Sequence, residues 1–280
     1  MEIKASDVKE LRQKTGAGMM DCKKALTESG GDFAKAEKLL KELGLAAAAK
    51  RSGRATNEGR VFTHITDSAA AMVEISCETD FVARNDDFVA LGDAIAADMA
   101  ATGKDISDDE YQNRLKDAMV TIKENMTLRR GTVLKAAAGE MIRDYIHGDS
   151  GKIGVLVKVA SDPAKLADER LKAFAFDVAL HVAAFRPTFL SAERADAAYI
   201  AEQQDIFVAQ AKQLGKPDNV TQGIAAGKLK KHLAEICLLE QGFVKDEKRS
   251  VSQAAADLGK EVGGTVEVVD FVYYMVGEDD

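Results

Sequence analysis

Residues 61–75 read VFTHITDSAAAMVEI, and this stretch decides the fold of the chain. It contains two short runs, Val61–Ile65 and Ala71–Ile75, that are rich in apolar and β-branched residues with polar ones interspersed. Between the runs, Asp67 and Ser68 are residue types that favour a tight turn. Two such runs on either side of a turn predict a β-hairpin.

The same order of elements recurs later in the chain. Met141–His147 and Ile153–Val159 are again mainly apolar runs, and Asp149 and Ser150 lie in the turn between them. A helix should follow each hairpin, because apolar residues then recur at helical spacing. They are Phe88, Leu91, Ile95 and Met99 after the first hairpin, and Phe174, Phe176, Leu180 and Phe185 after the second. The repeat predicts an α+β core of two duplicated hairpin-plus-helix subdomains.

Further helices are expected between and after these units. Ser107 and Glu110 have the spacing of a capping box that opens a helix. The apolar face of that helix would carry Tyr111, Leu115, Met119, Ile122 and Met126. Helices at about 191–214 and 220–239, separated by Gly215–Asn219, predict a protruding helical hairpin, and Thr265–Val276 should be a strand. The expected divisions are residues 60–140 for the first core subdomain, 141–280 for the second, and about 191–239 for the helical hairpin within it.

The N-terminal part, residues 1–45, is expected to form three short helices. Ser6 is placed as the cap of the first helix, Asp32 as the cap of the third, and Gly44 as its stop signal. Three helices in so short a span give a marginal core, which is typical of a small docking domain. Residues 46–59, rich in small and charged residues, would be a helix tail and linker.

Composition excludes several classes of protein. The 280 residues are 46% hydrophobic and 30% charged, with a net charge of −8, which argues against wrapping nucleic acid. No apolar run approaches the ~20 residues that span a bilayer, and the polar N-terminus has no secretory signal. Cys22, Cys77 and Cys237 are scattered, which indicates free thiols in a reducing compartment and argues against a zinc site. We expect a cytoplasmic protein that contacts neither membrane nor nucleic acid.

Motifs of catalysis and nucleotide binding are weak or missing. Gly148-Asp149-Ser150-Gly151 resembles the nucleophile segment of a serine protease, but these residues lie where a hairpin requires a turn. No GxxxxGK[ST] sequence occurs, so the chain is not expected to bind a nucleotide itself. The four histidines lie far apart in the sequence: His64, His147, His181 and His232.

Two segments are harder to explain as structure alone. In Thr15–Lys24, two glycines precede Met19 and Met20, an arrangement that suits either a protein-binding surface or a staple within the bundle. In Glu74–Asn85, Asp80 and Phe81 follow a strand directly. They are either a helix cap with its hydrophobic staple or a projecting wedge, an aromatic ring beside a carboxylate.

These segments also carry a family resemblance. Leu11–Leu26 and Glu74–Arg84 are similar to the two signature sequences of elongation factor Ts, the second centred on Thr79-Asp80-Phe81-Val82. The similarity covers nearly the whole chain, including Glu124–Arg130 and His147-Gly148. Ser76 stands where the family usually has asparagine, and some relatives continue beyond the position of Asp280 into a C-terminal helix.

The resemblance implies a ubiquitin-associated-like bundle, a two-part core, and a protein that promotes GDP release from the GTPase elongation factor Tu. It implies that Met19, Met20 and Lys23 dock on the nucleotide-binding domain of the partner. The wedge, Thr79–Val82, would enter that domain with Asp80 and Phe81. The part of the core after His147 would reach a second partner domain. No cofactor, metal or catalytic residue is implied, and a homodimer in the complex stays open.

Two other classes of function remain as alternatives. The first is an enzyme that uses Cys77, Glu78 and Asp80 as a thiol–carboxylate site, although no histidine partner is evident. The second is an adaptor that binds helices or tails through the N-terminal bundle alone. It would need no more than residues 1–54 for activity.

Overall fold

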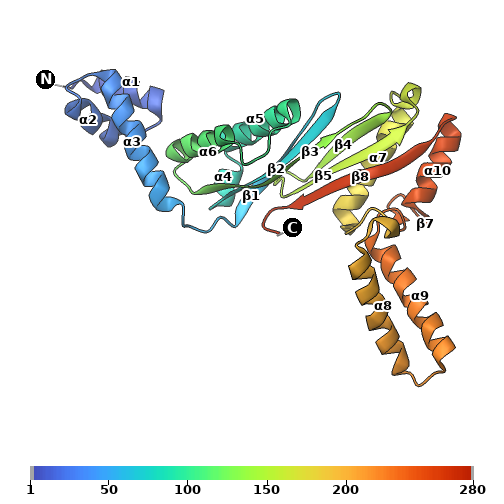
Figure 1. Ribbon diagram of the computed structural model, residues 1–280. Helices are drawn as coiled ribbons and strands as arrows, with labels where there is room; N and C mark the ends of the chain where they lie inside the picture. Colours follow the sequence, from blue (N-terminus) through green and yellow to red (C-terminus); the bar gives the residue numbers. More distant parts are fainter. Residues whose placement is uncertain (1–2, 279–280) are drawn as a thin grey trace.

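Two three-stranded antiparallel sheets form the centre of the molecule (Figure 1). This computed structural model describes residues 3–278. The first sheet has the strand order β1-β2-β3 and the second has the order β4-β5-β8. Their bounds are β1 (Glu58–Ile65), β2 (Ala69–Cys77), β3 (Met126–Lys135), β4 (Glu140–His147), β5 (Ile153–Ser161) and β8 (Val266–Met275). Both predicted hairpins and the predicted C-terminal strand are confirmed.

The two sheets lie face to face because their strands are apolar on both sides. In β1, Phe62 packs into the core beneath the helices, whereas the neighbouring Val61 packs between the sheets. In β5, Val155 and Val157 face helices, whereas Leu156 faces the first sheet. Successive side chains of a strand point to opposite faces. Along each strand they therefore alternate between a core beneath the helices and the core between the two sheets. The result is four layers, with helices outside and two sheets inside.

Helices cover the outer face of each sheet. The first sheet is covered by α5 (Asp86–Thr102) and α6 (Asp109–Ile122), and the second by α7 (Glu169–Phe185) and α10 (Val251–Val262). The short helices are α4 (Asp80–Ala83), η1 (Pro163–Lys165) and η2 (Ala192–Arg194). No helix within residues 3–278 is both long and apolar enough to cross a lipid bilayer.

The N-terminal bundle has its own small core. Its helices are α1 (Ala5–Thr15), α2 (Met19–Glu28) and α3 (Phe33–Arg51). The prediction that Ser6 caps the first helix is wrong, because Lys4 occupies the cap position and Ser6 bonds to Asp7. Gly44 as a stop signal is also wrong. A Cβ on Gly44 would come within 2.3 Å of Val120, so this glycine lets α3 pack closely on α6 and continue to Arg51.

The segment between the two hairpins differs from the prediction at both ends. Asp108, not Ser107, caps α6 by accepting from the Glu110 N–H, because the Ser107 hydroxyl donates to Asp105 instead. The helix does not reach Met126, since Lys123 adopts the left-handed conformation and ends it. Met126 instead begins β3, where it pairs with Cys77. Met126 lies at helical spacing from Ile122 by coincidence. The position of one apolar residue does not distinguish the periodicity of a helix from the alternation of a strand.

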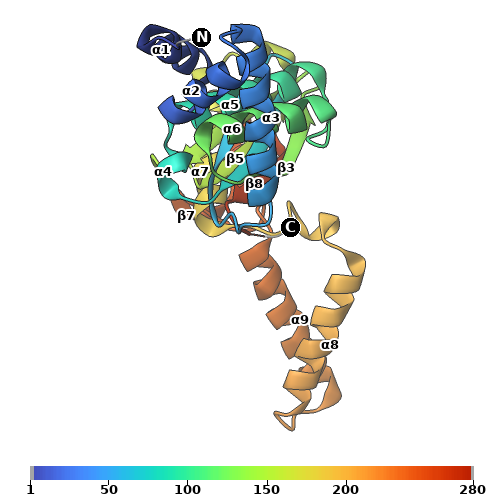
Figure 2. The ribbon, with the colours of Figure 1, turned by 90° about the vertical axis from the view of Figure 1, so that its left-hand side faces the viewer.

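The predicted helical hairpin is present as α8 (Ala197–Lys212) and α9 (Asp218–Ile236), which project from the core in Figures 1 and 2. At its base lie the short strands β6 (Gly242–Phe243) and β7 (Asp246–Ser250). A capping box opens α10, where Ser250 and Gln253 exchange hydrogen bonds. The sequence prediction did not include β3, β6, β7 or α10.

A buried carboxylate joins the two sheets. Glu74 of β2 is 0% exposed, and its Oε2 accepts from Arg130 Nε of β3 at 2.7 Å. Its Oε1 accepts from the Gly277 N–H at 3.0 Å, just after β8 of the other sheet. Arg130 also donates to the Met275 carbonyl and stacks on the Tyr274 ring at 4.3 Å. Glu74 also lies 3.6 Å from Arg129 Nε, so this carboxylate gathers polar contacts from both sheets at one edge of the core between them.

Candidate functional site

The segment after β2 turns sharply because two helix caps follow each other closely. Thr79 caps α4, with its Oγ1 accepting from the Val82 N–H at 3.3 Å. Asn85 then caps α5 by accepting from the Asp87 and Phe88 N–H groups. Side-chain oxygens at both caps satisfy N–H groups that a helix start leaves free. The short helix α4 is therefore held between two fixed points.

Phe81 lies outside the core at this bend. Its side chain is 83% exposed, whereas the neighbouring Ala83 is 4% exposed and Val82 packs against the core of the first sheet. The two inner residues anchor α4 while Phe81 points to solvent. Among the described residues 3–278, Phe81 is the most exposed large hydrophobic side chain, and aromatic residues are enriched at protein interfaces.

Asp80 is exposed beside Phe81. Its Oδ2 lies 3.7 Å from Arg84 Nη2, with both side chains more than half exposed. An exposed pair of this kind stabilises a protein only slightly. The Asp80 carboxylate is therefore accessible to a partner without loss of a strong internal interaction.

The N-terminal candidates lie on the outer face of α2. Met19 is 51% and Met20 73% exposed, and Lys23 is also exposed. Cys22, Ala25 and Leu26 form the opposite, buried face of the same helix. The interpretation of Met19 and Met20 as a staple inside the bundle is wrong, because neither side chain enters the bundle core. In Figure 2, α2 and α4 both lie toward the left edge of the molecule.

His147 lies at the exposed end of β4. Its Nδ1 is 2.9 Å from the Tyr145 hydroxyl. The turn that follows reaches the first sheet, where the Gly151 carbonyl accepts from the Val61 N–H at 2.8 Å. The structure thus distributes the predicted residues over three surfaces and does not gather them into one pocket.

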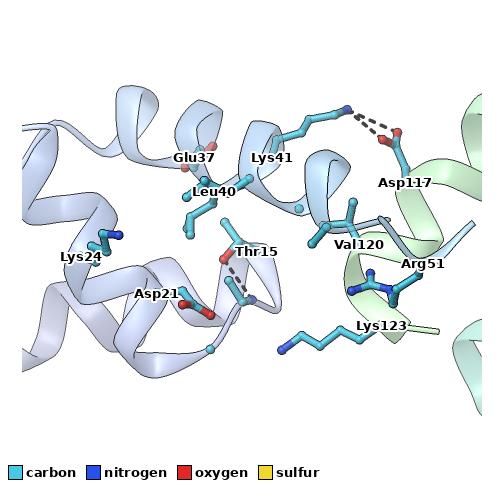
Figure 3. A pocket seen from close by; sticks show the side chains of 15 residues that line it. Thr15, Asp21, Lys24, Glu37, Leu40, Lys41, Arg51, Asp117, Val120 and Lys123 are labelled. Carbon is cyan, nitrogen blue, oxygen red and sulfur yellow. Dashed lines mark hydrogen bonds and ion pairs between the residues drawn. The ribbon is translucent and has the colours of Figure 1, made fainter. Parts of the chain in front are cut away.

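A cavity of about 610 Å³ lies between the bundle and α6, as Figure 3 shows, and none of the wedge residues lines it. Leu40 and Gly44 line it from α3, and Val120 and Lys123 from the α6 side. The Lys41–Asp117 ion pair joins the same two helices at 3.0 Å. This cavity lies beside the packing contact that attaches the bundle to the core.

Comparison with known proteins identifies the family. The family model described as elongation factor TS matches residues 78–278. The elongation factor Ts of Treponema denticola is 50% identical over 280 residues, which is 99% of each chain. That of Borrelia recurrentis is 48% identical over 278 residues, covering 99% of this chain and 100% of its own.

The chain belongs to the elongation factor Ts family. It is therefore a translation elongation factor of the nucleotide-exchange class, which acts in protein biosynthesis. The matched region begins at Glu78, directly before the wedge. The relatives named above extend the similarity over the N-terminal bundle as well.

The thiol of Cys77 is poorly suited to catalysis in this member of the elongation factor Ts family. Burial raises the pKa of the Cys77 thiol to about 12, and the Glu124 carboxylate adds to the rise. The thiol donates to the Thr79 carbonyl at 3.1 Å. A nucleophilic cysteine needs a depressed pKa, so the geometry disfavours the thiol–carboxylate alternative. Within residues 3–278, no three His, Cys, Asp or Glu side chains are arranged as a metal site.

Two residues next to the wedge had no role in the sequence interpretation. Glu124 accepts hydrogen bonds from Thr79, and the Asn125 N–H donates to Glu78 at 2.6 Å. That bond, with the Arg54 guanidinium, holds the pKa of the Glu78 carboxyl below its usual value. Both residues fall in a segment that resembles the elongation factor Ts family, which was the only signal in the sequence. Their contact with the wedge is long-range, so local pattern could not reveal it.

Proposed function

We propose that this chain promotes GDP release from elongation factor Tu by inserting Asp80 and Phe81 between helices of the nucleotide-binding domain of that partner. The observation that supports the proposal is the 83% exposure of Phe81 on a short helix fixed by caps at Thr79 and Asn85. A rigid, exposed ring loses little conformational freedom on binding. Its burial in a partner pocket supplies ~1.5–3 kcal/mol.

That binding energy can hold the partner in a conformation that binds GDP poorly. Tight GDP binding depends on Mg²⁺ and on backbone groups that surround the phosphates. A wedge that shifts neighbouring helices weakens those contacts. Coupling between two ligands is reciprocal, so nucleotide weakens the binding of the wedge protein by the same factor. Either nucleotide can then displace the chain, which needs no catalytic group and binds no nucleotide itself.

The remaining surfaces give the chain more than one attachment to the partner. Met19, Met20 and Lys23 form a docking surface on residues 1–45, joined by the tail and linker at 46–59 to the core. His147 and the second subdomain, 141–280, reach another partner domain. In support of two duplicated subdomains, each sheet pairs a hairpin with a third antiparallel strand and carries a helix on its outer face.

The direct test is the release of fluorescent GDP from elongation factor Tu, measured by stopped flow with and without this chain. We expect the release rate to rise with chain concentration and to saturate. Fluorescent GDP mixed with the chain alone should give no binding signal. An unchanged release rate at saturating chain would contradict the exchange function.

The docking surface can be tested by replacing Met20 and Lys23 with alanine together. We expect the concentration of chain that gives half-maximal release to rise about tenfold, because a methionine contact contributes ~1.5–3 kcal/mol when buried. The maximal rate should not change, since the wedge is intact. Deletion of residues 1–54 should leave a folded core with at least this loss of affinity. Equal half-saturation for the substituted and unsubstituted chains would show that α2 does not dock.

A further inference from the structure

The turn between α6 and β3 supports the wedge from the side of the core. Both hydrogen-bond donors of Thr79 point to one carboxylate. The Thr79 N–H donates to Glu124 Oε2 at 3.0 Å, and Thr79 Oγ1 donates to Glu124 Oε1 at 2.7 Å. Thr79 is the cap residue of α4, so this carboxylate fixes the residue from which the helix that carries Phe81 begins.

A second hydrogen bond joins the same two segments in the opposite direction. The Asn125 N–H donates to Glu78 Oε1, so Glu78 bonds to Asn125 while Thr79 bonds to Glu124. The Asn125 side chain, 4% exposed, donates to the Ser52 and Arg54 carbonyls at 3.3 and 2.7 Å. The turn therefore connects the wedge to the backbone that leaves the N-terminal bundle.

The backbone of the turn is also held in an uncommon conformation. Lys123 has φ 66°, and among residues 3–278 only one other residue that is not glycine, Arg186, has a positive φ. A lysine in the left-handed region is disfavoured relative to the ordinary helical conformation. This conformation ends α6 and lets the next two residues turn toward the wedge.

We propose that Glu124 is a positioning residue for nucleotide exchange, which sets the direction in which α4 presents Asp80 and Phe81. The inference rests on the proposed wedge function. An 83% exposed ring has few contacts of its own, so its direction depends on the backbone that carries it. A single helical turn is not stable by itself. Two charge-assisted hydrogen bonds to its cap residue supply the missing constraint.

The test replaces Glu124 with glutamine, which keeps the shape but offers one acceptor oxygen for two donors. We expect the maximal rate of GDP release to fall about tenfold, because a lost hydrogen bond to a charged group and a misplaced contact have effects of this order. The half-saturating concentration should stay within about twofold, because the docking surfaces are intact. Glu247→Gln, a change at an exposed glutamate on β7, is the matched control and should leave the rate unchanged.

Hydrogen exchange of the free chain gives a readout that does not depend on the partner. In Glu124→Gln, amides of residues 79–83 should exchange faster while those of β1 and β2 keep their rates. Unchanged exchange in residues 79–83 together with an unchanged release rate would overturn the positioning role. A general loss of protection would show a structural role instead and would overturn it as well.

Combination with Phe81→Ala separates this inference from the wedge function. If Glu124 acts mainly through Phe81, then Glu124→Gln should cause only a small further loss of rate in the Phe81→Ala chain, through Asp80. A full additional tenfold loss in that background would overturn the inference. If Phe81→Ala slows release and Glu124→Gln does not, only the positioning role fails. If Phe81→Ala itself leaves release unchanged, the wedge function fails and the positioning role fails with it.

Discussion

Replacing Phe81 with alanine should slow GDP release from elongation factor Tu by about 30-fold or more, because a central aromatic anchor contributes ~2–4 kcal/mol to an interface. The melting temperature of the free chain should change by no more than about 2 °C, since substitutions at exposed sites alter stability by ~0.5 kcal/mol or less. The two measurements are stopped-flow release of fluorescent GDP and thermal unfolding followed by circular dichroism. Asp80→Ala should give a smaller loss of rate through loss of a charge-assisted contact.

Phe88 provides the contrasting control a few residues along the chain. It is 0% exposed and packs against Phe62, so Phe88→Ala should lower the free energy of unfolding by ~3–5 kcal/mol. The folded fraction of the Phe88→Ala variant should still expose Phe81 to the partner. If instead Phe81→Ala destabilises the chain strongly and the folded fraction exchanges nucleotide normally, the wedge mechanism is wrong.

Replacing Glu74 with alanine should destabilise the chain about as much as Phe88→Ala does, although it creates no large cavity in a helix-covered core. Glu74 is 0% exposed and bonds to Arg130 and to the Gly277 N–H, so its removal leaves the Arg130 guanidinium without this carboxylate between the sheets. Breaking a buried ion pair by removing one partner costs ~3–5 kcal/mol. Urea unfolding followed by circular dichroism measures this loss.

A matched control distinguishes burial from charge. Glu267 of β8 is exposed, and Glu267→Ala should change the free energy of unfolding by ~0.5 kcal/mol or less. Glu74→Leu combined with Arg130→Met should recover part of the stability lost in Glu74→Ala, because an apolar pair needs no charge compensation. Equal effects of Glu74→Ala and Glu267→Ala would show that the buried pair does not join the sheets.

Most of the secondary structure follows from local sequence signals. Both hairpins, the helices after them and the helical hairpin are marked by turn residues and apolar periodicity, which act over a few residues. The errors have a different origin. Gly44 is a stop signal in isolation, but contact with Val120 on α6 makes it an internal residue of α3. The sequence did not predict strand β3, because its place is set by pairing with β2, and the nearest paired residues, Cys77 and Met126, are already 49 residues apart.

For the candidate site, too, local signals were readable in the sequence and long-range contacts were not. The sequence indicates Asp80 and Phe81 through their place at the end of a strand, but the pattern alone gives a helix cap with its staple as the default and an exposed wedge as the alternative. Only the packing of Val82 and Ala83 against the core shows that Phe81 is the residue left outside. Glu124 is separated from Thr79 by 45 residues, so no local pattern could connect them.

The extended outline of the chain, with the bundle at one end and the helical hairpin projecting near the other, has a consequence for its surface area. The chain exposes 15094 Å², whereas a compact monomer of 30.1 kDa exposes about 11,700 Å². The difference exceeds the roughly 800 Å² that one partner contributes to an interface of standard size. The chain therefore has enough exposed surface for the proposed docking residues, the wedge and the second subdomain to contact a partner at separate places without one large continuous interface.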